Sequence, residues 1–254
     1  MKKTVQLPII SAAVIGSLAY MMADTIHECL GHGGTCLLLG HKISLLNSVY
    51  FRSNTGNYRV DIGGPIANLM AGVLIYALLQ KMRNLSFFAK WLLLHAMVYN
   101  LCWFSGTMLE SIIKSDGDWS HAANELNLSS HITHWLLLLV SVLSYMVFFR
   151  MTRSCLVQQF QTSPYSKNQL LLYPYLFAVV ASFFAGLFFA GDRWNTAIGG
   201  VLELVSSLPL LFIRFKPGTT SGAHPRPFRV SYITAALILF VVFCFTMGKG
   251  IVFT

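Results

Sequence analysis

The sequence predicts an all-α polytopic membrane protein with about seven transmembrane helices. Of its 254 residues, 55% are hydrophobic and only 11% are charged, and the mean hydropathy is +0.62. A soluble domain carries roughly 25% charged residues, so a soluble chain this poor in charge could not keep its surface in water. The composition therefore excludes an ordinary soluble domain, a disordered chain and a typical nucleic-acid-binding protein.

Apolar stretches long enough to cross a bilayer define the expected helices, since each crossing needs about 20 residues. Residues 27–40 continue the first stretch, and Met21 and Met22 do not form the small-residue cleavage site of a signal peptide. The run from His41 to Val60 holds short β-prone segments and a turn-like cluster at 53–57, which predicts a small β-hairpin. The seven expected spans are 5–26, 61–80, 87–113, 131–150, 169–190, 195–214 and 231–252.

The distribution of charge predicts the orientation. With a cytoplasmic N-terminus, most of the 18 basic residues fall in cytoplasmic segments, as the positive-inside rule requires. We therefore expect a multi-pass protein of a bacterial inner membrane, and the net charge of +9 gives no reason to expect a nucleic-acid partner. The five cysteines lack Cys-x-x-Cys spacing and are expected to be small buried hydrophobes.

The stretch from Thr25 to Gly34 carries the strongest chemical signal. His27 and Glu28 are adjacent, and His32 follows among glycines at the end of an apolar helix. Neutral histidine is the commonest metal ligand, and a neighbouring glutamate can act as a general base. Ionisable groups at membrane depth are costly and are functional candidates by default. The alternative is a solvated helix end that carries these residues without a function.

Three motifs in this order resemble the site-2 protease group of intramembrane metalloproteases. His27-Glu28…Gly31-His32 is followed by a β-prone stretch, then by Gly63-Gly64-Pro65-Ile66-Ala67-Asn68 at the start of the second span, and by Asp116-Gly117-Asp118 after the third. The resemblance covers about residues 10–120. It therefore divides the chain into a protease-like core, 1–120, and four additional transmembrane helices, 121–254.

The resemblance implies a zinc cofactor and assigns roles to particular residues. His27 and His32 would be two ligands, Glu28 the general base, and Asn68 would hold a substrate strand or polarise the developing oxyanion. A catalytic zinc needs a third protein ligand, for which we favour Asp118, since Trp119 could bury and orient it. Asp116, in the Asp-Gly context typical of the family, is the alternative, and either residue could instead be a solvated loop acid.

The spacing of the two histidines departs from the family pattern. The family has His-Glu-x-x-His, whereas here five positions separate His27 from His32. On a straight α-helix that separation leaves the two side chains about 140° apart, against about 40° for four positions. A π-bulge at this point would restore convergence, and Gly31 tolerates irregular backbone. We favour the bulge over the alternative in which Glu28 itself is a ligand with His32.

Two further acids lie within the expected spans. Asp24, one turn before Glu28, could orient a ligand histidine. Glu203 lies midway along the sixth span, where an acid requires a partner or a water-filled cavity. Along a straight helix His27 lies about 36 Å from Lys3, which places it near the outer side of the membrane. Bacterial site-2 proteases usually hold their zinc nearer the cytoplasm.

The sequence thus favours a membrane-embedded zinc metallopeptidase that cleaves other membrane proteins within or at the edge of the bilayer. One alternative is a seven-span zinc-dependent lipid amide hydrolase, by analogy with alkaline ceramidases, which would use His121, His131 and His134. The other is a catalytically inactive membrane scaffold, in which the extra residue of the motif has removed the metal site.

Overall fold

The structure is a computed structural model that describes residues 9–82, 84–161, 163, 165–215 and 230–253. Within these residues seven helices are long and apolar enough to cross a membrane, so the predicted fold class is confirmed. The candidate spans are Ile9–Leu38, Tyr58–Lys81, Phe87–Lys114, Ser130–Phe160, Asn168–Leu187, Arg193–Phe212 and Val230–Gly248.

The first span contains the site motif and is not a uniform α-helix. It consists of α1 (Ile9–Thr25), a π-helical segment η1 (Ile26–Gly33) and α2 (Gly34–Leu38). The backbone N–H of Gly34 donates to the carbonyl of Cys29, five residues earlier, which is the hydrogen bond that defines a π-helix. The predicted bulge is therefore present, and it lies on the two histidines and the glutamate of the motif.

A small antiparallel sheet follows and confirms the expected hairpin. Strands β1 (Ile43–Leu46) and β2 (Phe51–Ser53) pair directly, and their turn lies at residues 47–50, before the cluster that the sequence marked as the turn. A third strand, β3 (Ile251–Val252), pairs with the other edge of β1, giving the order β2-β1-β3. The end of the last expected span thus belongs to the sheet.

The second and third spans form the centre of the bundle. Helix α3 (Tyr58–Lys81) begins at Asn57, whose side chain accepts a hydrogen bond from the Arg59 N–H. Helix α4 (Phe87–Lys114) begins at Ser86, which accepts from the Ala89 N–H in the same way. Helix α4 carries the largest fraction of buried residues of any span, 72% of its most apolar window, so it lies in the core of the bundle.

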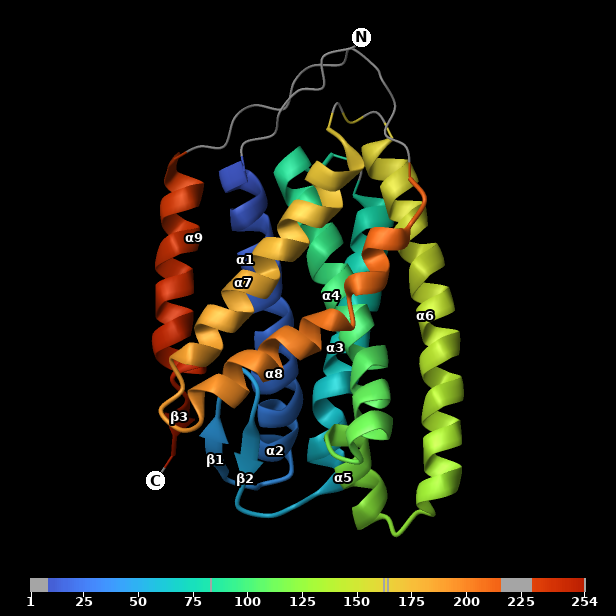
Figure 1. Cartoon of the computed structure of the whole chain (residues 1–254), viewed down its shortest axis with the longest axis vertical. Coiled ribbons are helices and arrows are strands. Elements are labelled where there is room, and N and C mark those ends of the chain that lie inside the picture. The colour runs from blue at the N-terminus through green and yellow to red at the C-terminus, as the bar shows by residue number, and fades with distance from the viewer. Residues whose placement is uncertain (1–8, 83, 162, 164, 216–229, 254) are drawn as a thin grey trace.

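The remaining helices surround this centre. Helix α5 (Asp118–Glu125) is short and lies beside the sheet end of the bundle, and α6 (Ser130–Phe160) flanks one side (Figure 1). Helices α7 (Tyr173–Leu187), preceded by η2 (Asn168–Leu172), and α8 (Arg193–Val205), followed by η3 (Leu208–Phe212), cross the bundle obliquely. Helix α9 (Val230–Phe243) and η4 (Cys244–Gly248) form the opposite flank.

Two spans differ from the sequence prediction for identifiable reasons. Helix α6 continues ten residues past the end predicted at 150. The prediction followed the apolar stretch alone, whereas the helix goes on through polar residues and keeps Arg150 and Arg153 exposed. The sixth span breaks after Val205, where Ser206, Ser207 and Pro209 replace the α-helix by a short 3-10 turn. The break places Glu203 in the last turn of α8 instead of the middle of a continuous span.

Candidate metal centre

The π-helical segment brings His27 and His32 together. Their Nε2 atoms lie 3.2 Å apart and the ring centroids 4.8 Å apart, with both side chains buried. On an α-helix these residues would point to different sides, whereas a π-turn joins residues five apart. The backbone conformation thus brings together two histidines that are five positions apart.

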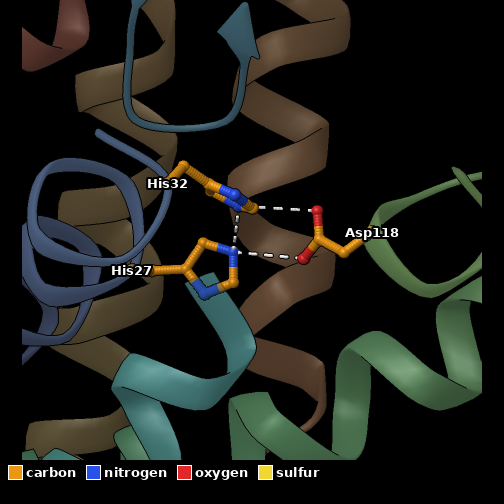
Figure 2. A group of neighbouring side chains, drawn as sticks. All are labelled: His27, His32 and Asp118. Atoms are coloured by element: carbon orange, nitrogen blue, oxygen red, sulfur yellow. Dashed lines mark hydrogen bonds and ion pairs between the residues drawn. The ribbon is translucent and has the colours of Figure 1, made fainter. Parts of the chain in front are cut away.

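Asp118 completes the group from a separate element. Its Oδ2 lies 3.3 Å from His27 Nε2 and its Oδ1 lies 3.5 Å from His32 Nε2. Figure 2 shows the three side chains converging from two different parts of the chain. One ligand atom from each of the three residues lies within 4.8 Å of the other two. His27, His32 and Asp118 therefore form a group that could hold a metal ion.

The distances fit a metal ion. Nitrogen ligands about 2.0–2.1 Å from a tetrahedral zinc lie about 3.3 Å from each other, which matches the separations in the group. The space beside the histidines is also kept free of side chain by Gly64, because a Cβ at this position would lie 2.7 Å from His27 Nε2. The residues present therefore fit a bound metal ion.

Hydrogen bonds to Nδ1 orient both histidines. His27 Nδ1 lies 3.0 Å from Asn68 Oδ1, and His32 Nδ1 lies 2.7 Å from the carbonyl oxygen of Val60. Both acceptors require the imidazole to carry its proton on Nδ1, which leaves the Nε2 lone pair directed at the group. Asn68, expected to contact substrate, thus also supports a candidate ligand. The Val60 carbonyl was not foreseen, since a backbone acceptor has no sequence signature.

Ring contacts and glycines hold this arrangement in place. The His32 ring stacks on Phe51 of β2, with centroids 5.4 Å apart, and His27 meets Trp103 of α4 edge-on at 6.0 Å. Helices η1 and α3 touch through backbone, because a Cβ on Gly31 would lie 2.5 Å from the Cα of Gly64. The glycines of the two motifs therefore permit the close approach that brings Asn68 and Val60 to the histidines.

Asp118 is positioned by the turn between α4 and α5. Gly117 has a positive φ of 99°, which favours glycine and reverses the chain before Asp118. Trp119 donates from Nε1 to Thr107 Oγ1 at 3.0 Å, and this fixes the first turn of α5 on α4. Burial raises the pKa of the Asp118 carboxyl, but the neighbouring His32 and His27 outweigh this effect and hold that pKa below its ordinary value.

The other acids and histidines considered from the sequence lie elsewhere. Asp116 is exposed and pairs with His121 at 3.0 Å, so the structure brings Asp118, and not Asp116, to the histidines. His131 and His134 lie at the start of α6 and do not join the group.

Asp24 and Glu28 are buried next to the group. Asp24 has no hydrogen-bond partner among the described residues, so the expected support of a ligand histidine comes from Asn68 and Val60 instead. Glu28 interacts electrostatically with His27 and Asp118, and one of its carboxylate oxygens is buried without a hydrogen-bond partner in the described structure. That carboxylate is therefore available for chemistry at the group.

The chain matches no family model, no curated protein and no solved structure.

Proposed function

We propose that this protein is a membrane-embedded zinc metallopeptidase that hydrolyses peptide bonds of other membrane proteins. The observation that carries the proposal is the convergence of His27, His32 and Asp118, buried beside Glu28, at one end of a bundle of candidate membrane spans. Two imidazoles and a carboxylate are a ligand set typical of hydrolytic zinc sites, which keep one position open. When bound, a zinc ion supplies Lewis acidity at this point.

The chain's own residues supply the remaining chemistry. Glu28 accepts the proton of the attacking water and returns it to the amine that leaves when the peptide C–N bond breaks. The Nδ2 atom of Asn68 is buried without a hydrogen-bond partner among the described residues, so it can donate to the developing oxyanion. This second role of Asn68 is compatible with the bond from its Oδ1 to His27.

The sheet supports a peptide substrate over a lipid. Strand β2 is an edge of the described sheet, and Phe51 within it stacks on His32. An extended peptide that pairs with this edge would run past the metal group, and main-chain hydrogen bonds would hold it there. A ceramidase-like site would draw on His131 and His134, which do not contribute to the group.

Metal content tests the centre. Purified wild type should contain about one zinc per chain by elemental mass spectrometry, since catalytic zinc is held by three protein ligands of this kind. The His27→Ala, His32→Ala double variant should lose it, and the matched His131→Ala, His134→Ala variant should keep it. Zinc-free wild type after resupply would support the inactive scaffold, and zinc loss in the matched control would support the ceramidase-like alternative.

Activity tests the reaction. The Glu28→Gln variant should retain zinc and lose cleavage of transmembrane-segment peptides, because glutamine cannot accept the proton. Cleavage at the wild-type rate by the Glu28→Gln variant would refute the peptidase mechanism while leaving the metal centre intact.

A further inference from the structure

Acidic residues gather around the metal group. The chain has only nine, and all except Asp192 belong to one connected set of electrostatic neighbours. The chain as a whole carries twice as many basic residues as acidic ones. The set consists of Asp24, Glu28, Asp61, Glu110, Asp116, Asp118, Glu125 and Glu203.

Glu203 enters this set from a helix outside the protease-like core. It lies on the same face of α8 as Gly200 and Thr196, which are buried, whereas Ile198 and Leu202 are exposed on the other face. Helix α8 runs obliquely across the bundle and packs on α7 and α4 (Figure 1). The Glu203 carboxyl consequently interacts with Asp24, Glu28 and Asp118 together.

Asp24 is buried and Glu203 is half-buried, and neither carboxyl is paired with a basic side chain in the described structure. Asp24 is 0% exposed and neither of its oxygens has a hydrogen-bond partner, and one oxygen of Glu203 is in the same state, within the residues that the structure describes. A buried carboxylate without a partner costs several kcal/mol. Such groups inside a membrane protein are retained when they serve a ligand or a pathway. Their oxygens are not part of a metal-type group of three or more ligands among the described residues.

The charges around the metal group can be counted. A zinc ion carries two positive charges, which Asp118 and Glu28 balance when ionised. Lys114 forms an ion pair with Glu110, and this pair is neutral. Asp116 forms an ion pair with His121. The other four acids of the set, Asp24, Glu203, Asp61 and Glu125, are in no ion pair of the described structure, and of these only Asp24 has both carboxyl oxygens buried without a hydrogen-bond partner there. A cation beside Asp24 and Glu203 would therefore stabilise their ionised carboxylates, which no basic side chain of the described structure does.

We propose that Glu203 and Asp24 form an anionic subsite that receives a basic side chain of the substrate near the scissile bond. The inference rests on the proposed function and names its substrate class: membrane segments with a lysine or arginine flanking the cleaved bond. The Tyr20 hydroxyl interacts with both acids and with the hydroxyls of Ser48 and Ser182, and these three hydroxyls supply neutral acceptors beside the acids. A lysine ammonium has three donors to satisfy, and these groups match that need.

The test uses full-length protein in detergent with zinc bound. Substrates are a series of otherwise identical transmembrane-segment peptides that carry lysine, glutamine or glutamate at each of the positions flanking the cleaved bond. At one of the flanking positions, the kcat/KM of wild type should be about tenfold or more higher for the lysine peptide than for the glutamine peptide. The glutamate peptide should have the lowest kcat/KM of the three. Glu203→Gln should remove most of this preference and retain full zinc content, and Asp24→Asn should act in the same direction.

The control lies on the same helix. Asp192 caps α8 by accepting a hydrogen bond from the Asn195 N–H, and asparagine caps equally well. Asp192→Asn should therefore preserve both zinc and the preference for lysine. A wild-type enzyme that cleaves all peptides equally, or a preference that survives in Glu203→Gln, would overturn the inference while the peptidase function stands. Failure to cleave any peptide would remove the proposed function and the inference with it.

Discussion

At the residue scale, Asn68 links the two halves of the proposed chemistry through the two ends of its amide. Oδ1 accepts from His27 Nδ1, and Nδ2 is buried without a partner in the described structure. Groups that orient a metal-binding histidine typically change metal affinity 10–100-fold when they are removed. A lost oxyanion donor typically lowers kcat by about 10²–10³. Two substitutions at this position should therefore separate the two roles.

We expect Asn68→Ala to weaken zinc binding about 10–100-fold, because His27 loses the acceptor that fixes its tautomer. Asn68→Asp keeps an acceptor for His27 and removes the donor, so it should retain zinc and still cleave slowly. Zinc affinity by competition with a chelator and kcat on one peptide measure the two effects. The control is Asn100→Ala, a buried asparagine of α4 that bonds to the Ala96 carbonyl, and it should leave zinc affinity unchanged. Equal zinc affinity in Asn68→Ala and wild type would contradict the supporting role.

At the scale of elements, the π-helical segment accounts for the unusual spacing of the motif. The additional residue can be assigned to Leu30, because its side chain is 65% exposed and contributes little to the core. Removing Leu30 leaves His27-Glu28-Cys29-Gly31-His32, in which the histidines are four positions apart and converge on an α-helix. Adding one residue instead increases the spacing of the two histidines further, and neither an α-helix nor the present π-turn would bring their side chains together.

We expect deletion of Leu30 to retain zinc, since the shortened segment can form a regular α-helix with the two histidines about 40° apart. Insertion of an alanine after Leu30 should abolish zinc binding, although it changes the length of the chain by the same amount. Elemental mass spectrometry of the two variants measures the contrast. Zinc retained by the insertion and lost by the deletion would show that the π-turn does not set the geometry of the centre.

Local sequence patterns predicted those parts of the site that depend on residues close together in the chain. The lengths of the apolar stretches predicted the seven spans, and the His-Glu motif predicted His27 and His32. The two histidines are five positions apart and would not converge on an α-helix, and this predicted the π-bulge. Strand β3 was missed because two apolar residues at the end of an apolar span carry no separate signal. The position of Glu203 against Asp24 depends on the oblique path of α8, and hydropathy contains no information about that path.

At the scale of the whole molecule, the metal group and the sheet lie at one end of the bundle. Helix α1 begins at Ile9 at the opposite end, and the connection between α3 and α4 lies there too (Figure 1). A bilayer core is about 30 Å thick, and His27 follows Ile9 by eighteen residues, or about 27 Å of helix. The two ends therefore correspond to the two faces of a membrane, and the orientation decides from which side substrates reach the site.

The positive-inside rule predicts that the site faces the outside, because the basic N-terminal segment is retained in the cytoplasm. Two exposed positions report the two ends: Thr55 beside the sheet and Asn84 between α3 and α4. In intact cells, a membrane-impermeant maleimide should label a Thr55→Cys variant and label Asn84→Cys only after permeabilisation. The reverse pattern would place the metal group near the cytoplasmic face, as in most bacterial site-2 proteases, and would show that charge does not set the orientation. In the expected orientation, the proposed substrates would reach the metal group from the outer side of the membrane. The basic side chain that we propose Glu203 receives would then lie at the outer end of the cleaved membrane segment.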